Sequence, residues 1–526
     1  MVAEILNGEL HVTPRPALCD RLCCLGQFAA ITGALKASYP KEIAMSRHRW
    51  VGIVVLCMLL AAVAPYAQTS KPGRLRAGAA KVDITPKESE LAVSTDTIRD
   101  HLFVRAIVVE NGNTCAVLVG MDVGGARDPV VLDALPRAVA ATQCPAENFV
   151  ISATHTHSSN TLGLGGAGSP TPKTIADAIV SAVTTAKSRM APARVGYGTT
   201  KVDLNVNRDL FNSRLEWRQQ PNPDGPSDKT LSVVEFIGDD YRPIGVYMNY
   251  AMHPVNFYLR GVISADFPGE ASRYIEDLYH NGAVAIFSQG ASGDQNPRLT
   301  ERGQATVGGP PAPAAPRAST PPAPAASTPA APAANSGRGF NAAAAQSDRA
   351  AIPAAELPAY KEGLARTGAV VVMMGTLIGE SAIHVMRDEI KPVDTALLWG
   401  GQERFTCPGR ERLDAANPTR ENVFPGYKDG PDVNLKVGLL RVGDINFVSV
   451  NGEIYSNIGL KLKAQAPAAK TMVVTLANGA ANSGYIYSDD AYSHLTFQVI
   501  GSRLKPGCAE GKIISAALNL MHTSGQ

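Results

Sequence analysis

Alternating strand and helix patterns early in the sequence limit the folds that this chain can adopt. Two apolar runs, 102–109 and 115–123, flank Asn111-Gly112, a pair typical of tight hairpin turns. A helical spacing of apolar residues follows over 129–142, and the next apolar run begins at Phe149. This succession predicts an α/β (mixed α+β) fold with a mixed β-sheet core, flanking helices and an active site at the C-terminal ends of strands.

The same alternation continues along the chain. Further helices are expected over 175–190, 264–278, 357–387 and 454–462. Further strands are expected over 231–237, 243–252, 283–288, 435–442, 445–450 and 472–476. A long irregular segment that contains 205–209 is expected before the first of these strands. One domain over 77–520 accommodates all of these elements, and a Pro- and Ala-rich tract over 304–348 interrupts it. We expect this tract to be a disordered loop, because it cannot bury enough apolar surface.

Charge and composition exclude one class of partner and indicate export. The net charge of +2 and the lack of a basic block with interleaved aromatic residues argue against nucleic acid as a partner. Residues 45–68 combine a basic start, an apolar core and small residues, as secretory signal peptides do. We therefore expect a periplasmic or secreted protein, or a membrane-anchored one if the segment is not cleaved, and we interpret 1–44 as a non-native or disordered extension. The cysteines after residue 68 allow two disulfides or isolated buried thiols: Cys115, Cys144, Cys407 and Cys508.

Two histidines, His155 and His157, follow the apolar run that begins at Phe149. If they continue a strand, both side chains point to the same face, because side chains alternate along a strand. Neutral imidazole is a common ligand for zinc-like metals and also transfers protons near neutral pH. A polar strand end is the alternative interpretation of the pair. His253 likewise follows an apolar strand, which favours one site shared by all three histidines.

Three later segments supply further candidates. The Gly-rich turn after the strand 283–288 carries Asp294. Glu453 follows the strand 445–450 at the start of a helix, where it is either an acid that the helix N-terminus favours or a third metal ligand. A polar loop near the end of the chain carries three tyrosines in a pattern typical of a pocket lining: Tyr485, Tyr487 and Tyr492.

Eight short motifs occur in a fixed order between residues 77 and 520. They are Ala-Gly-Ala-Ala-Lys-Val-Asp-Ile-Thr-Pro, Thr-His-Thr-His-Ser, Asn-Arg, Ala-Met-His-Pro, Ser-Ala-Asp-x-Pro-Gly, Gly-Asp-x-x-Pro, Gly-Glu and Gly-Tyr-x-x-x-x-x-x-Tyr. This succession resembles the N-terminal catalytic domain of the neutral/alkaline non-lysosomal ceramidase family, of which the chain would be a divergent member. The resemblance implies one zinc ion per chain, bound by His155, His253, Glu453 and Tyr485.

The resemblance also implies a reaction, hydrolysis of the amide bond of a small-molecule or lipid-like N-acyl substrate, with peripheral membrane contact. In this interpretation His157 stabilises the oxyanion or moves a proton, and Arg208 holds the substrate oxygen. Asp294 shapes the turn under the metal. Asp122 and Asp266 are expected to orient the ligand histidines, with helix capping as the alternative for Asp266.

Two positions depart from the family pattern. Asn296 stands where the family's turn carries a serine that is needed for activity, and Phe497 stands where the family has a tyrosine. These changes predict a substrate other than ceramide. Two alternatives stay open: a metal- or ligand-binding homologue with impaired catalysis, and a metal-dependent esterase or phosphoesterase. A phosphoesterase site would hold two metals about 3.5–4 Å apart, with Asp122 or Asp294 as ligands.

Overall fold

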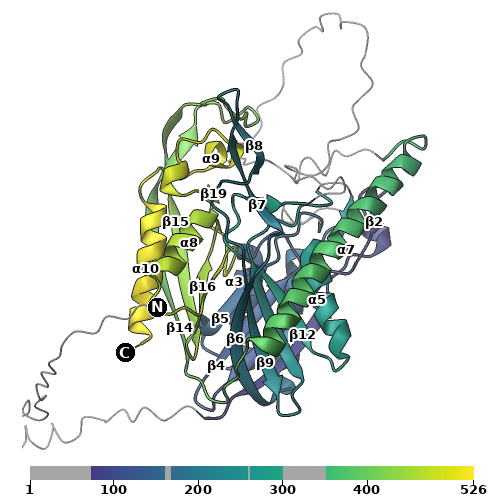
Figure 1. Ribbon diagram of the computed structural model, residues 1–526, viewed down its shortest axis with the longest axis vertical. Coiled ribbons are helices and arrows are strands. Elements are labelled where there is room, and N and C mark those ends of the chain that lie inside the picture. The colour runs from purple at the N-terminus through teal and green to yellow at the C-terminus, as the bar shows by residue number, and fades with distance from the viewer. Residues whose placement is uncertain (1–72, 160–167, 259–260, 300–350, 526) are drawn as a thin grey trace, which may run out of the picture. The chain divides into compact units, whose positions relative to one another are not determined.

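An eight-stranded mixed sheet, in the order β12-β10-β9-β6-β1-β3-β4-β5, forms the centre of the fold in the computed structural model (Figure 1). The structure describes residues 73–159, 168–258, 261–299 and 351–525. The expectations for 1–44, 45–68 and 304–348 lie outside these residues. The strands are β1 (Arg76–Asp83), β3 (Phe103–Glu110), β4 (Cys115–Met121), β5 (Phe149–Ala153), β6 (Ala191–Lys201), β9 (Thr230–Gly238), β10 (Pro243–Tyr250) and β12 (Val284–Gln289). The predicted mixed α/β fold is confirmed.

The predicted hairpin is confirmed by the antiparallel pairing of β3 and β4, which ends at Glu110 and Cys115. Asn111 closes its turn, because its side-chain oxygen accepts hydrogen bonds from the backbone N–H groups of Asn113 and Thr114 at 3.1 and 3.0 Å. Gly112 adopts a φ of +82°, which glycine tolerates without strain. The local turn chemistry therefore sets the register of the two strands.

The eight-stranded sheet folds back on itself, so that its two halves pack face to face. Only two residue pairs join β1 to β6 at the bend, and one apolar cluster holds Ile107 and Leu118 of one half together with Phe236 and Ile286 of the other. A Cβ atom on Gly120 would lie 2.5 Å from Cγ2 of Ile286. The close approach of the halves therefore requires glycine at this position.

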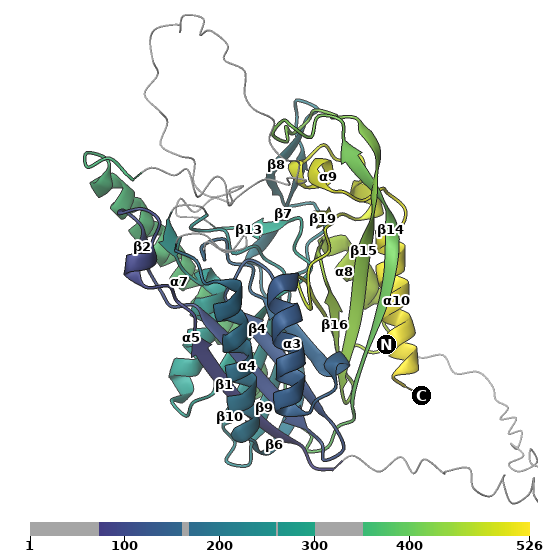
Figure 2. The same cartoon turned by 180° about the vertical axis from the view of Figure 1, so that it is seen from behind.

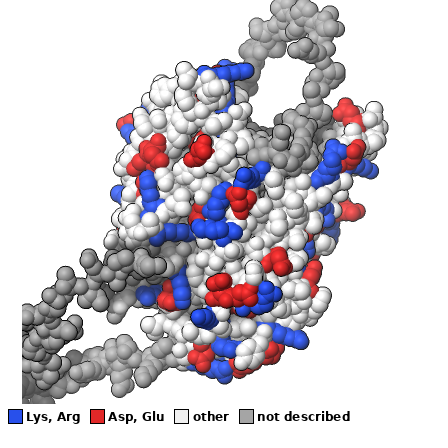
Figure 3. All heavy atoms as spheres, viewed as in Figure 1, with Lys and Arg blue, Asp and Glu red and all other residues white. Residues whose placement is uncertain are grey.

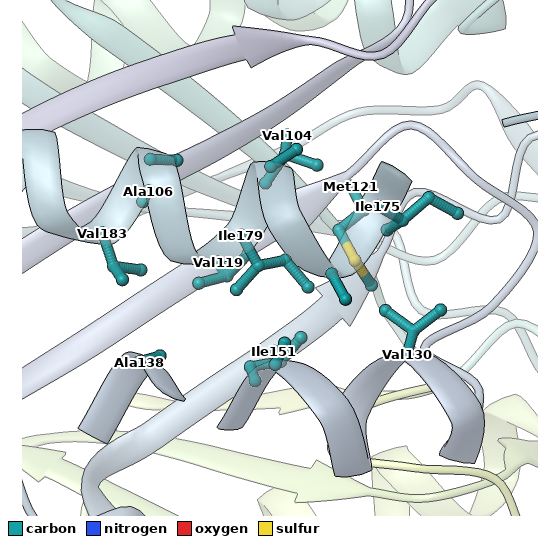
Figure 4. Close-up of a cluster of buried hydrophobic side chains, with 14 of the residues drawn as sticks. Val104, Ala106, Val119, Met121, Val130, Ala138, Ile151, Ile175, Ile179 and Val183 are labelled. Atoms are coloured by element: carbon teal, nitrogen blue, oxygen red, sulfur yellow. The ribbon is translucent and has the colours of Figure 1, made fainter. Parts of the chain in front are cut away.

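Helices cover both outer faces of this folded sheet. One half carries α3 (Asp128–Thr142) and α4 (Pro172–Ser188), and the other carries α5 (Asp266–Tyr279) and α7 (Leu357–Asp388). The two pairs of helices come to the front in opposite views (Figures 1 and 2). Figure 4 shows Ile175, Ile179 and Val183 of α4 packed among valines of β3 and β4. The helix that the sequence predicted over 175–190 is confirmed.

Among the described helices, α7 is long and apolar enough to cross a membrane by length and composition. Half of its most apolar window is buried within the protein, and α7 packs against α5. Core helices of soluble proteins meet the same criterion, so this feature is weak evidence for a membrane span. His384 of α7 is exposed.

A second sheet of four strands adjoins the first. It contains β14 (Leu398–Arg412), β15 (Tyr427–Val442), β16 (Ile445–Val450) and β18 (Thr471–Val474), and α8 (Ser456–Gln465) and α10 (Ala509–Thr523) pack on it. Three small sheets complete the description: β7 (Asn205–Phe211) with β8 (Trp217–Asn222) and β13 (Gln295–Pro297), β17 (Glu453–Ile454) with β19 (Tyr485–Ile486), and β2 (Thr97–Ile98) with β11 (Val262–Ile263). The short helix α9 (Phe497–Gly501) follows β19.

Two sequence expectations about these elements are wrong. The segment that was expected to be irregular forms β6, β7 and β8. The strand β14, which pairs with β15, was not predicted. The Gly and Pro residues of β6 obscure its strand pattern, and its ladder of pairs with β9 stabilises it.

The cysteines pair as Cys115–Cys144 and Cys407–Cys508, which resolves the alternatives that the sequence left open.

Candidate metal centre

The three histidines meet at the end of the folded sheet where β5 and β10 terminate. The expectation that His155 and His157 continue a strand is wrong, because β5 ends at Ala153 and His155 adopts a left-handed φ of +67°. Residues other than glycine rarely adopt this conformation, and such residues cluster at functional sites. The two rings nevertheless converge, with their Nε2 atoms 3.3 Å apart. The ligand atoms of His155, His157 and His253 all lie within 4.8 Å of one another.

Backbone carbonyl groups orient two of these rings. Nδ1 of His155 donates to the carbonyl oxygen of Gly124 at 2.6 Å, and Nδ1 of His253 donates to that of Gln295 at 2.9 Å. A carbonyl oxygen only accepts hydrogen bonds, so the proton of each neutral ring is on Nδ1 and the lone pair is on Nε2. Both lone pairs therefore face the shared space, as metal-binding histidines require.

The two carboxylates that were expected to orient the histidines, those of Asp122 and Asp266, form hydrogen bonds with other groups. Asp122 accepts hydrogen bonds from Arg105 at 2.7 Å and from the backbone N–H of Phe103 at 2.9 Å. Asp266 accepts from the backbone and side-chain amides of Asn256 at 2.9 and 2.7 Å, and from the backbone N–H of Phe267 in the first turn of α5 at 2.7 Å, which agrees with the helix-capping alternative. Neither carboxylate contributes to histidine orientation, and the carbonyl groups above replace them.

Glu453 brings a carboxylate to the same space. Its Oε1 atom lies 2.7 Å from Nε2 of His253 and 3.5 Å from Nε2 of His155. Nε2 of His253 and Oε1 of Glu453 are buried and have no hydrogen bond of suitable geometry with any described residue. These two acceptor atoms thus face each other with no donor between them, and a cation would relieve their mutual repulsion.

The distances among these atoms suit a tetrahedral metal. Two ligands that bind one zinc ion at about 2.1 Å lie about 3.4 Å apart. Nε2 of His155 lies 3.3 Å from Nε2 of His157 and 3.5 Å from Oε1 of Glu453, and both distances match this value. The distance from Nε2 of His253 to Oε1 of Glu453, 2.7 Å, is shorter. The residues therefore fit one metal ion.

Burial sets the charge state of the cluster. It lowers the pKa of His253 to about 4, an effect that the Arg208 charge reinforces, and the neighbouring Glu453 charge only partly opposes it. Burial also lowers the pKa of His157 well below its usual range, with smaller contributions from the other two histidines. Burial by itself raises the pKa of Glu453, but the imidazoles of His155 and His253 outweigh it and hold the pKa well below its usual range. Near neutral pH, His157 and His253 are thus neutral beside an ionised carboxylate.

Comparison with known proteins relates part of the chain to one family. Residues 78–310 match the family model described as neutral/alkaline non-lysosomal ceramidase, N-terminal. This match covers less than half of the chain, and residues 78–310 are thus similar to this ceramidase family. A neutral ceramidase of Pseudomonas aeruginosa is 28% identical over 282 residues, which are 48% of this chain. The match spans 41% of that relative's length.

Two solved structures share the fold. The neutral ceramidase from Pseudomonas aeruginosa has a TM-score of 0.59 at 18% identity, and the likeness covers 86% of this chain and 75% of that one. A ceramidase complexed with C2 has a TM-score of 0.62 at 17% identity, and the likeness covers 86% of this chain and 76% of that one. The likeness thus reaches well beyond residue 310, where the match to the ceramidase family model ends.

Arg208 and Tyr485 line the centre in this ceramidase-like fold. Glu453 and Tyr485 pair in β17 and β19, and one guanidinium nitrogen of Arg208 lies 3.2 Å from the Tyr485 hydroxyl. A second nitrogen donates to the Asn296 side-chain oxygen at 3.0 Å. Burial lowers the pKa of Arg208, but Tyr485 and Glu453 raise it further, so this buried side chain stays charged. Asn296 therefore accepts a hydrogen bond in place of the family's serine.

Asp294 lies beneath the centre and ties its parts together. Its carboxylate accepts from the backbone N–H and the hydroxyl of Ser456 at 2.8 and 2.9 Å and from Asn207 at 2.8 Å. These bonds join the Gly-rich turn to the start of α8 and to β7. Burial raises the pKa of this carboxyl to about 6.

The late tyrosines occupy different environments, so the prediction of a shared pocket lining is correct only for Tyr485. Tyr487 is buried in a core cluster, and Tyr492 is exposed. The sequence interpretation missed Tyr258, whose ring centre lies 5.2 Å from that of His157. Burial raises the pKa of Tyr258 to about 12, partly opposed by the charge of Arg208. Its only sequence signal is its position five residues after His253.

A separate cavity of about 510 Å³ lies between α3 and the four-stranded sheet. Val131, Phe149 and Leu439 contribute to its apolar wall, and Lys436 and Asp128 contribute charge. None of the residues described above as part of the metal centre lines it. The arrangement of the potential metal ligands, rather than this cavity, therefore locates the candidate active site.

Proposed function

We propose that this protein is a zinc-dependent hydrolase that cleaves the amide bond of lipid-like N-acyl substrates. The observation that carries this proposal is the convergence of the His155 and His253 lone pairs on the Glu453 carboxylate, with no donor between His253 and Glu453. A nitrogen and oxygen donor set of this kind suits zinc. Similarity of residues 78–310 to the ceramidase family supports the class of bond that is cleaved.

His155, His253 and Glu453 would hold the metal, with Tyr485 as the proposed fourth ligand. When bound, zinc would lower the pKa of a bound water towards ~7 and polarise a substrate carbonyl. Because burial keeps His157 neutral, its ring can accept a proton beside the ligands and return it to the leaving nitrogen. His157 also lies within reach of a ligand position, so its role as ligand or as proton carrier is a proposal that mutation can decide.

Arg208 would stabilise charge that develops on the substrate oxygen. It is buried, cationic and fixed by hydrogen bonds to Asn296, Tyr485 and the Gly293 carbonyl. A fixed cation in a dry site stabilises a developing oxyanion at little reorganisation cost. The aromatic ring of Phe497 lies 5.6 Å from the guanidinium carbon of Arg208 and supplies no hydroxyl. The pocket thus differs from the family pattern, and we propose a substrate other than ceramide.

A catalytically impaired binding protein is the second candidate, and the replacement of the motif serine by Asn296 favours it. No described residue favours a two-metal phosphoesterase, because Asp122 and Asp294 are engaged by Arg105, Ser456 and Asn207 rather than by the histidines. Export, which the two disulfides support, remains part of the proposal.

Turnover of matched substrates tests the proposal. The zinc-loaded protein is assayed with N-acyl sphingoid bases, N-acyl amino acids and aryl esters of equal chain length, each with and without chelator. We expect chelator-sensitive release of fatty acid from at least one N-acyl substrate. Bound zinc without any turnover would support the binding protein, and turnover of esters alone would contradict amide hydrolysis.

A further inference from the structure

A second arginine, Arg127, lies at the same edge of the sheet as the candidate metal centre. Strands β4 and β5 are parallel, and their last pair joins Met121 to Ala153. The segments that follow these strands therefore start side by side, one leading to Arg127 and the other to His155. They are also joined directly, because the backbone N–H of His155 donates to the carbonyl oxygen of Val123 at 3.1 Å. The loop that ends at Arg127 thus forms one wall of the centre.

A tight turn of this loop places the side chain of Arg127. The backbone N–H of Arg127 donates to the carbonyl oxygen of Gly125 at 3.0 Å, and a Cβ atom on Gly125 would lie 3.9 Å from Cγ of Arg127. The side chain therefore lies beside Gly125, next to Gly124, whose carbonyl orients a ligand histidine. The following residue, Asp128, accepts from the backbone N–H of Ala480 at 2.9 Å, in the loop before β19. The turn and this bond fix the start of α3 beside the centre.

The charge of Arg127 acts on the centre. The side chain is partly buried, and its Nε atom is fully buried. Burial lowers the pKa of Arg127, and the charge of Glu453 partly opposes this effect. Such an interaction requires proximity, because solvent and salt screen charges that lie far apart. Glu453 also interacts electrostatically with Arg208 of β7. Two guanidinium groups from separate segments therefore act on one carboxylate.

With a metal bound, the centre would hold an excess of positive charge. Among the described residues, Glu453 is the only carboxylate in contact with the ligand histidines. A divalent metal and the guanidinium groups of Arg127 and Arg208 would thus face a single ionised carboxylate. Buried positive charge without compensation is costly, so an anion that enters this space would be stabilised.

An N-acyl amino acid supplies such an anion at a fixed place. Its carboxylate is bonded to the carbon atom that carries the amide nitrogen, so it reaches the centre together with the bond to be cleaved. A guanidinium group binds a carboxylate through two parallel N–H···O bonds, which add both affinity and orientation. A neutral N-acyl sphingoid base offers hydroxyl groups at this place, and these do not compensate the charge of Arg127.

Broad surface charge does not explain a preference for anions. On the face of the molecule shown in Figure 3, Lys and Arg side chains lie among Asp and Glu side chains, without a large area of one sign. The net charge of the whole chain is only +2. Selection of an anionic substrate would therefore come from groups at the centre rather than from long-range attraction.

We propose that Arg127 binds the carboxylate of the substrate and makes this protein selective for N-acyl amino acids over neutral N-acyl sphingoid bases. This inference rests on the proposed function, because it names the substrate class of the same site. Arg208 then acts on the oxygen of the amide that is cleaved, and Arg127 acts on the carboxylate of the amino acid that leaves. Arg127 is in this sense a specificity-determining residue.

Binding of ligands that resist hydrolysis tests the proposal without any need for turnover. The zinc-loaded full chain is titrated in a calorimeter with N-(decylsulfonyl)glycine and with N-(decylsulfonyl)ethanolamine, in which a neutral hydroxymethyl group replaces the carboxylate. The wild type should bind the glycine ligand more tightly by about tenfold or more, because hydrogen bonds between charged groups are the stronger ones. R127Q should remove this preference. R127K should restore part of it, since lysine keeps the charge but not the paired donors.

The matched control is R137Q on the same helix, where Arg137 pairs with Asp133 and Asp177. It should bind both ligands like the wild type. A merely structural role of Arg127 would weaken both ligands equally in R127Q, and that result would overturn the proposal. Equal affinities of the wild type for the two ligands, or an R127Q protein that keeps the full preference, would also overturn it. Selective binding by a protein that hydrolyses no N-acyl substrate would keep the role of Arg127 and refute only the hydrolase.

Discussion

His253 gives the sharpest prediction about acid stability. Its side chain is fully buried, and its pKa falls from 6.5 to about 4 in the folded, metal-free protein. The unfolded chain therefore binds a proton below about pH 6.5, whereas the folded state does not until about pH 4. The stability that neutral His253 contributes is complete above pH 6.5 and is lost as the pH falls towards 4. Between about pH 7.5 and 4.5, this loss amounts to about 2 to 3 kcal/mol.

The variant H253N isolates this contribution. Asparagine does not titrate, and its amide can still donate to the Gln295 carbonyl that Nδ1 of His253 contacts at 2.9 Å. Urea unfolding, followed by circular dichroism with chelator present, gives the free energy of unfolding at both pH values. The wild type should lose about 2 to 3 kcal/mol more than H253N on acidification. The control H384N, at an exposed histidine of α7, should lose as much as the wild type. An equal loss of unfolding free energy in the wild type and in H253N would refute the reasoning.

Four further predictions concern the site and one disulfide. H157A should keep bound zinc but lower kcat by about 100-fold if His157 carries a proton, and loss of zinc in this variant would make it a ligand instead. N296S restores the hydroxyl of the family turn and should raise the ratio of ceramide to N-acyl amino acid hydrolysis; an unchanged ratio would mean that Asn296 does not set substrate choice. Y258F should lower kcat by about tenfold or more if the phenol donates to the substrate oxygen, with KM and zinc content unchanged, and wild-type kcat would exclude that contact. C407S should lower the free energy of unfolding by about 4 kcal/mol, measured by denaturant titration, because the Cys407–Cys508 bond closes a loop of 101 residues; a loss below about 1 kcal/mol would contradict this.

Local signals in the sequence predicted much of the fold. The helix α4 has its apolar residues at helical spacing, and the β3–β4 turn has the side-chain chemistry that such a turn requires. The strands β6, β7 and β14 lack such signals. The strand β14 contains several charged residues and glycines and has few buried positions. Its many residue pairs with β15 stabilise it instead. Tertiary pairing decides such strands, and a single sequence does not display it.

The candidate ligands could be predicted for a related reason. His155 and His253 follow apolar strands, and the ends of strands at one edge of a sheet lie together. The groups that orient them could not be predicted, because the carbonyls of Gly124 and Gln295 carry no side-chain signature. The same holds for Tyr258, which reaches His157 through the turn after β10 rather than through a motif.

The metal content of the purified protein tests the central claim most directly. After dialysis against zinc and removal of the unbound ion, we expect about one zinc ion per chain, with X-ray absorption showing nitrogen and oxygen ligands at about 2.0–2.1 Å. The double variant H155A/H253A should lose the ion while remaining folded by circular dichroism. Zinc that is absent from the wild type, or retained in full by H155A/H253A, would contradict a metal centre at these histidines.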